Sequence, residues 1–254
     1  MKTEKKQFKK IGSYSENDVL FLLKDLSDIP LEGTTEERER KIQRGEHYSE
    51  TLPIEYQPPE EYIHLFWQTL NEYKKTVALY VGVVAERILE RKGRDVVLVS
   101  LARAGTPVGI LIKRYLKWKY NLDLPHYSIS IIRDKGIDTN ALCYILNEHK
   151  KSTIQFIDGW TGKGAMSKEL SKACIEFNKK SQRKLDDTLA VIADPGHCTD
   201  LFGTRDDFLI PSACLNSTVS GLVSRTVLND KYIGPDDFHG AKYYKQLENV
   251  DLSN

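Results

Sequence analysis

Short apolar runs alternate with helix-like segments between residues 95 and 195, and this rhythm constrains the fold more than any other feature. The runs lie at 95–101, 126–132, 153–157 and 189–194, and helical patterns follow the first three at 104–116, 139–149 and 165–175. Strands that alternate with helices build a parallel sheet with helices on both faces, and ligands bind at the carboxyl ends of its strands. We therefore predict an α/β fold with a parallel sheet.

The segment after the third run carries the strongest local signal for a binding site. Asp158 follows the run, and glycines interrupt the turn at Gly159, Gly162 and Gly164 before the next helix. A strand, an acid, a glycine-rich turn and a helix gather backbone N–H groups where a phosphate can bind. The pattern indicates a site for a phosphorylated sugar or a nucleotide, although an ordinary tight turn has similar glycines. The spacing around Lys163 is not that of a P-loop.

Two other loops follow strands of the same predicted sheet. Small residues flank Arg103 after the first strand, so the backbone can approach a ligand while the guanidinium binds a phosphate. A charged loop with Arg133 and Lys135 follows the second strand. Because parallel strands end at one edge of a sheet, these loops and the Asp158 loop are expected to share a crevice.

The regions outside this core are less regular. Residues 60–91 repeat apolar residues at helical spacing, which predicts one long helix that packs on the sheet or on a second copy of the chain. We also predict helices at 14–24, 32–44 and 217–228, and a short strand at 208–211. These patterns divide the chain into an N-terminal part, 1–59, with a basic tail at 1–12, and an α/β domain, 60–254.

Composition excludes several classes of protein. The 254 residues carry a net charge of +1, which gives no reason to expect DNA binding. No apolar run approaches the roughly 20 residues of a membrane span, and the charged N-terminus is not a secretory signal. The four cysteines are too widely spaced to indicate a zinc site or a disulfide framework, so we expect a cytoplasmic protein.

The order of the three loops resembles that of the type I phosphoribosyltransferases. Residues 99–105 are similar to the diphosphate loop of that family, and residues 156–164 to its loop for phosphoribosyl pyrophosphate (PRPP). The family has two adjacent acids in the PRPP loop in most members, whereas Gly159 follows Asp158 here. The resemblance implies a C-terminal hood over the acceptor, and no residue is assigned directly as a metal ligand. It also implies that Asp158 binds the ribose hydroxyls, that Arg133 and Lys135 belong to a mobile lid, that Ala102, Arg103 and Ala104 bind the diphosphate with Mg²⁺, and that Thr161, Gly162, Lys163 and Gly164 hold the 5-phosphate.

A narrower resemblance extends over nearly the whole chain. Residues 47–53, the Asp158 loop, and residues 210–226 and 237–244 look like the bacterial StiP family. These are phosphoribosyltransferase-like proteins of tellurite-resistance and stress operons, which also carry the label of cysteine proteases. Members often continue into a Pelota-like RNA-binding domain, and this chain stops before any such domain.

Three functions follow from these patterns. The first is an Mg²⁺-dependent transferase that uses PRPP and a nucleobase-like small-molecule acceptor in a stress-response nucleoside pathway. The second is a cysteine peptidase in which Cys214 is the nucleophile and His47, His197 or His239 is its base, with Cys198 as a second choice of nucleophile. The third is a PRPP or nucleotide sensor without catalysis, for which the single acid before Gly159 is the main support.

Overall fold

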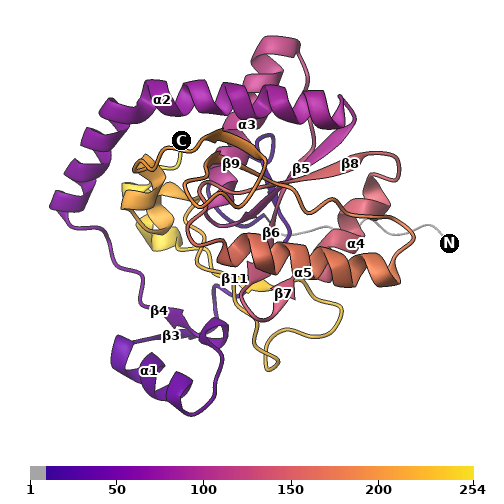
Figure 1. The fold of residues 1–254 in the computed structure, drawn as a ribbon. Helices are drawn as coiled ribbons and strands as arrows, with labels where there is room; N and C mark the ends of the chain where they lie inside the picture. Colours follow the sequence, from indigo (N-terminus) through magenta and orange to yellow (C-terminus); the bar gives the residue numbers. More distant parts are fainter. Residues whose placement is uncertain (1–9) are drawn as a thin grey trace.

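A computed structural model describes residues 10–254 of the chain, and a seven-stranded sheet lies at its centre (Figure 1). The strand order is β1-β6-β5-β8-β9-β10, and all pairs along this path are parallel. β7 pairs with β6 and is antiparallel to it. The strands of this sheet are β1 (Leu20–Phe21), β5 (Val96–Ala102), β6 (His126–Ile132), β7 (Gly136–Ile137), β8 (Thr153–Ile157), β9 (Leu189–Ala193) and β10 (Leu201–Thr204). The predicted α/β fold with a parallel sheet is confirmed.

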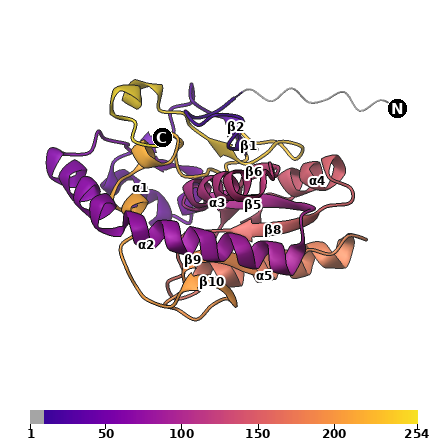
Figure 2. The ribbon, with the colours of Figure 1, turned by 90° about the horizontal axis from the view of Figure 1, so that it is seen from above.

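Helices cover both faces of the sheet, as predicted, because its central strands are apolar on both sides. On one face α2 (Glu60–Lys92) and α3 (Gly105–Tyr120) pack against the strands, with Ile88 and Leu116 fully buried. On the other face α4 (Thr139–Glu148) and α5 (Ala165–Lys180) enclose a second core (Figure 2).

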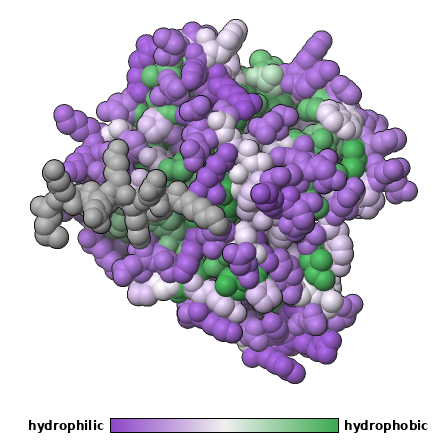
Figure 3. All heavy atoms as spheres, turned by 180° about the vertical axis from the view of Figure 1, so that it is seen from behind, coloured by the Kyte–Doolittle hydropathy of each residue, from purple (hydrophilic) through white to green (hydrophobic). Residues whose placement is uncertain are grey.

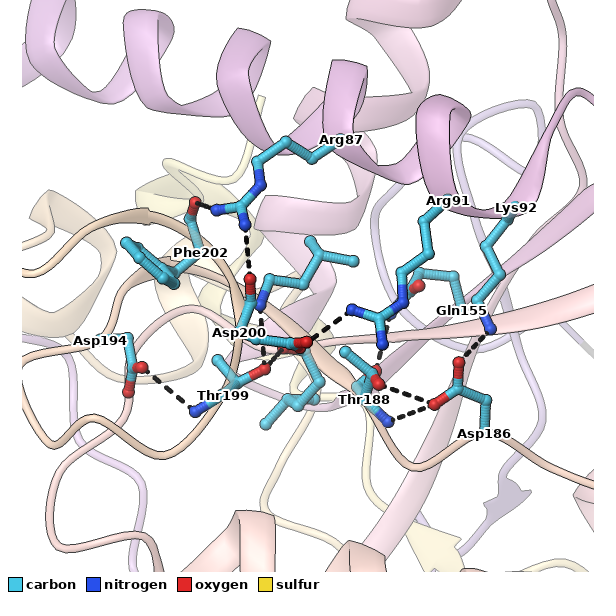
Figure 4. Close-up of polar contacts among 12 residues, drawn as sticks. Arg87, Arg91, Lys92, Gln155, Asp186, Thr188, Asp194, Thr199, Asp200 and Phe202 are labelled. Carbon is cyan, nitrogen blue, oxygen red and sulfur yellow. Dashed lines mark hydrogen bonds and ion pairs between the residues drawn. The ribbon is translucent and has the colours of Figure 1, made fainter.

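The C-terminal half of α2 is fastened to the edge of the sheet by charged side chains (Figure 4). The Arg87 guanidinium donates to the carbonyl of Phe202 on β10 over 2.8 Å. Arg91 pairs with Asp200 at 2.9 Å, and the ammonium of Lys92 lies 2.5 Å from Asp186. These charged contacts add to the apolar packing of α2 on the sheet. The predicted long helix is confirmed.

The strand order creates a crevice for a ligand between β5 and β8. The chain passes from β5 to β6 on one side and later returns to β8 and β9 on the other side of β5. The connections that leave the carboxyl ends of β5 and β8 therefore diverge, and open α/β sheets bind ligands at this point. Figure 1 shows both strands in the middle of the sheet.

Three predictions for the flanking regions are wrong. Residues 14–24 form a turn, β1 and the start of β2 (Lys24–Asp25), because Leu22 and its neighbours are buried between the sheet and the C-terminal region. Residues 208–211 are not a strand, and the strand that follows β9 in the sheet is β10. The predicted helix at 217–228 ends after η3 (Ser217–Val219), since Gly221 and Leu222 adopt left-handed conformations at φ 73° and 57°.

A small unit lies beside the sheet, at the lower left of Figure 1. It contains β3 (Glu32–Gly33), α1 (Thr35–Gln43), η1 (Tyr48–Glu50) and β4 (Leu52–Pro53), and β3 pairs with β4. Thr34 and Glu37 form a capping box at the start of α1, which is why the charged segment predicted as a helix does form one. The division of the chain at residue 59 stays a prediction, and the predicted basic tail lies outside the described residues up to residue 9.

The C-terminal region covers the crevice as an irregular hood. It consists of the 3₁₀ helices η2 (Pro211–Cys214), η3 and η4 (Lys245–Val250), together with β11 (Gly240–Ala241), which pairs with β2. On the face drawn in Figure 3, apolar residues form separate small areas between hydrophilic ones. None of the helices in residues 10–254 is both long enough and apolar enough to cross a membrane.

Candidate functional site

Two neighbouring pockets lie in the crevice, and Asp158 lines both of them. We call the first, of about 670 Å³, the apolar pocket, because Phe208, Leu209 and Ile210 of the hood line it. We call the second, of about 620 Å³, the glycine-loop pocket, because residues 161–167 line it. Asp158, Trp160 and Asp207 line both pockets, so these three residues mark the boundary between them.

Asp158 is a buried acid with little compensation for its charge. Its side chain follows β8, the residue is 8% exposed, and the carboxylate accepts a 2.8 Å hydrogen bond from the N–H of Gly159. No cationic side chain of residues 10–254 forms an ion pair with it. Burial raises the pKa of Asp158 to about 7, and the Gly159 hydrogen bond only partly opposes this shift. The carboxyl group is therefore available to a cation or to hydroxyl groups of a ligand.

The glycine loop lies against the turn after β9 at distances that exclude side chains. A Cβ atom on Gly196 would lie 1.9 Å from the carbonyl oxygen of Gly162, and one on Gly162 would lie 2.8 Å from the Trp160 ring. Gly164 adopts φ 77° directly before α5. The first N–H groups of α5 have no acceptor within the helix, and the buried Ser167 hydroxyl has no hydrogen-bond partner in the described chain. These groups form a cradle suited to an anion.

Asp194 supports this cradle from β9, and sequence reasoning did not assign it a role. It is fully buried and accepts hydrogen bonds from the Thr161 hydroxyl and the Arg205 guanidinium. It also accepts from the backbone N–H of Cys198 at 2.9 Å. The N–H of Thr199 donates to it at 3.1 Å (Figure 4). Asp194 therefore fixes Thr161 and the turn after β9 together. An acid directly after a buried strand, the same signal that singled out Asp158, would have identified it.

The loop after β5 lies on the opposite wall of the crevice. A Cβ atom on Gly105 would lie 2.4 Å from the carbonyl oxygen of Ile157, so only glycine allows this loop to pack on β8. The peptide bond between Ala102 and Arg103 is cis, and Arg103 and Ala104 line the apolar pocket.

The Arg103 guanidinium is engaged within the protein. It donates to the carbonyl oxygen of Val223 over 3.2 Å and lies 3.5 Å from a carboxylate oxygen of Glu55. The same Glu55 oxygen accepts a 2.7 Å hydrogen bond from the N–H of Ser217, a contact that the sequence did not indicate. Arg103 therefore connects the N-terminal part of the chain to the hood, and its predicted contact with a diphosphate stays a prediction.

Of the two residues predicted in the loop after β6, one lines the glycine-loop pocket. Arg133 lines the glycine-loop pocket, and its N–H donates to the Tyr48 hydroxyl over 3.0 Å. The N–H of Asp134 donates to the buried Glu169 of α5 over 3.0 Å, which holds the loop near the cradle. Lys135 is exposed and lines neither the apolar pocket nor the glycine-loop pocket.

The cysteines and histidines of the peptidase hypothesis form no hydrogen bond with one another in the described residues. Within residues 10–254, the only hydrogen-bond contact of the Cys214 sulfur is with the Thr69 hydroxyl, at 3.5 Å. His47 contacts Ser49 at the start of η1, and His239 contacts the buried Ser130. His197 lies in the turn after β9, next to Cys198 and the glycine loop. The structure therefore brings the glycine loop and Arg133 together in one pocket, and within residues 10–254 it forms no hydrogen-bonded pair of Cys214 and a histidine.

Comparison with known proteins identifies relatives over nearly the whole length. Residues 12–254 match the family described as "Tellurite-like stress resistance cysteine protease StiP". A curated relative from Acinetobacter baylyi (strain ATCC 33305 / BD413 / ADP1), named cysteine protease StiP, is 37% identical over 251 residues. The match includes 95% of this chain and 64% of the relative, so the chain spans less than two thirds of that protein's length.

Solved structures give weaker similarities. A hypothetical protein from Neisseria gonorrhoeae with bound ppGpp is 12% identical with a TM-score of 0.36, over 53% of this chain and 81% of that chain. A hypoxanthine phosphoribosyltransferase from Trypanosoma cruzi, in complex with the product IMP, is 15% identical with a TM-score of 0.34, over 53% and 68%. A hypoxanthine-guanine-xanthine phosphoribosyltransferase is 13% identical with a TM-score of 0.32, over 51% and 73%. The family match extends over much more of the chain than these similarities do.

Proposed function

This chain belongs to the StiP family, and we propose that it is a phosphoribosyltransferase that transfers the phosphoribosyl group of PRPP to a small-molecule acceptor. The observation that carries the proposal is the meeting of two pockets at Asp158. One pocket has the backbone geometry of a phosphate site, and the other is apolar and large enough for a planar ring. A transferase needs this arrangement, because it must hold donor and acceptor on either side of the reacting carbon.

Each part of the crevice has a role in this reaction. The N–H groups at the start of α5 and the Thr161 and Ser167 hydroxyls bind the 5-phosphate, and Asp158 accepts hydrogen bonds from the ribose hydroxyls. A nitrogen of the acceptor forms a bond to C1 of the ribose while the bond from C1 to the diphosphate oxygen breaks. Positioning of the two reactants and stabilisation of the departing diphosphate supply the rate enhancement.

Mg²⁺ fits this site only together with the donor. No group of three or more acidic, histidine or cysteine side chains in residues 10–254 forms a metal site. Asp158, whose carboxyl group lacks a cationic partner, would contact an ion brought in by the diphosphate. The ion would neutralise charge on that leaving group.

Calorimetry with PRPP and Mg²⁺ tests the proposal. We expect wild-type protein to bind PRPP and Asp158→Asn to lose at least tenfold in affinity, because an amide cannot compensate the ion or accept from two hydroxyls. Asp207→Asn changes a carboxylate at the same boundary and serves as the matched control. If millimolar PRPP does not bind the wild type, the proposal is wrong. Binding without release of diphosphate in the presence of any nucleobase would instead support the sensor.

A cysteine peptidase is the second candidate, because the family description and the name of the relative both state that activity. Cys214 lines a pocket beside Arg103, so its sulfur faces a space that a ligand can enter. The decisive variant is Cys214→Ser, which removes the nucleophile and changes one atom. Loss of peptide hydrolysis in this variant, with PRPP binding unchanged, would favour the peptidase.

A further inference from the structure

A third pocket, of about 340 Å³, continues the apolar pocket on the side away from Asp158. Arg103, Leu215 and Asn216 line both pockets, so a ligand in one has access to the other. Residues 53–59, which connect the small unit to α2, form the other wall of the third pocket. The crevice thus has three successive compartments, whereas PRPP and an unsubstituted ring account for two.

The third pocket contains a positive charge without a partner. Arg225 of the hood lines it and is exposed, and no ion pair or side-chain hydrogen bond of Arg225 occurs among the described residues. Arg103 in the shared wall is different, because Glu55 and Val223 already engage it. Arg38 of α1 is close enough to Arg225 to feel its charge, and the buried Nε atom of Arg38 has no hydrogen-bond partner within residues 10–254.

Arg103 and Arg225 line the same pocket, and the charge of Arg225 acts on both Arg103 and Arg38. Burial lowers the pKa of Arg38, and the positive charge of Arg225 lowers it further. Burial also lowers the pKa of Arg103; Glu55 opposes this shift, and Arg225 adds to it. Within the described chain, Glu55 is the one acid that forms an ion pair with any of the three. Excess positive charge in a partly buried cluster is unfavourable, and a bound anion would compensate it.

We propose that this third pocket binds an oxyanion carried by the acceptor, with Arg225 as the residue that recognises it. The acceptor is then a planar ring with a carboxylate or a phosphate group, rather than a neutral base. Arginine suits this role because its planar donors match the paired oxygens of both groups. The exposed rings of Tyr56 and Tyr62 give the pocket an apolar rim on which the linked part of the ligand can lie. The inference names the substrate class of the proposed transferase and therefore rests on that function.

The test uses three probes that share one ring: benzoate, phenyl phosphate and benzamide. Ligand-observed NMR titrations without PRPP measure their binding to wild type, Arg225→Gln and Arg94→Gln. Arg94 precedes β5, at the end of that strand opposite the crevice, so its variant removes the same charge elsewhere. We expect at least one of the two anionic probes to bind wild type and Arg94→Gln about tenfold more tightly than benzamide, and Arg225→Gln to lose this preference. The relative affinity of benzoate and phenyl phosphate identifies the oxyanion.

Three results would overturn the inference: benzamide binding as tightly as both anions, no anionic probe binding, or a preference for anions that survives in Arg225→Gln. Calorimetry with PRPP and Mg²⁺ separates this failure from failure of the transferase proposal. Arg225→Gln should bind PRPP as the wild type does. If instead it loses PRPP, the third pocket holds the diphosphate and the assignment to the acceptor is wrong. If wild type does not bind PRPP, the transferase proposal fails while the probe titrations still decide whether the pocket binds anions.

Discussion

The carboxyl ends of β8 and β9 each present a buried aspartate, and the two differ in how their charge is compensated. Asp194 after β9 accepts from two backbone N–H groups, a hydroxyl and a guanidinium. Asp158 after β8 accepts from one N–H group, and burial raises its pKa to about 7. A carboxylate with four donors inside the protein holds the fold together, whereas one with a single donor has capacity left for a ligand. Burial alone therefore does not distinguish a structural acid from a functional one.

The pH dependence of stability is the largest effect that this difference predicts. Asp158 keeps its proton in the folded state up to about pH 7, while an unfolded aspartate releases it near pH 4. The protonated Asp158 therefore stabilises the folded state fully below about pH 4. This contribution to the free energy of unfolding falls by about 4 kcal/mol as the pH rises to 7. Urea unfolding of wild type and Asp158→Asn between pH 3 and 8 should show this loss in the wild type alone. If the free energies of unfolding of the two proteins differed by the same amount at every pH, Asp158 would not be the acid with the uncompensated charge.

Replacement of Asp194 tests the other side of the comparison. Asp194→Asn leaves Arg205 without its ion-pair partner and turns an amide N–H₂ group toward donors, so we expect a loss of about 3 kcal/mol in the free energy of unfolding. Asp200→Asn removes an exposed acid that pairs with Arg91 and should cost less than about 1 kcal/mol. Equal losses in the two variants, measured by urea unfolding at pH 7, would show that the Asp194 network is not what stabilises the turn.

Thr161→Val is expected to change stability least, because it tests a single hydrogen bond of Asp194. It removes the hydroxyl that donates to Asp194, and hydrogen bonds to charged groups contribute about 1.5–3 kcal/mol. Thr188→Val removes a hydroxyl that donates to Asp186 in a half-buried position, where water can take its place. It is the matched control and should cost less than Thr161→Val. Thermal unfolding of both variants should rank them in this order. If Thr188→Val were the more destabilised variant, the bond from Thr161 to Asp194 would not be what holds the glycine loop in place.

The sequence predicts the strands and helices of the core because their residues are apolar on the faces that the sheet requires. It fails where tertiary contacts decide the backbone. Asn216 caps the short helix at Ser217–Val219, but residues 217–224 are all buried, and the left-handed Gly221 and Leu222 end that helix after one turn.

Some residues of the candidate site could also be predicted from the sequence, and others could not. The Asp158 loop and Arg133 follow directly from the ends of strands, so they are visible in the sequence. Glu55 and Arg225 come from segments far apart in the chain, and only tertiary packing brings them to Arg103. No local pattern encodes such a cluster.

Trp160 gives this molecule an internal optical reporter. Its indole N–H donates to Asp207 over 3.0 Å, its ring is 46% exposed, and it borders both the apolar and the glycine-loop pocket. The other two tryptophans, Trp67 on α2 and Trp118 on α3, border neither pocket. A compound that enters either compartment changes the surroundings of one fluorophore out of three, so occupancy of the crevice can be followed by emission from the unlabelled protein.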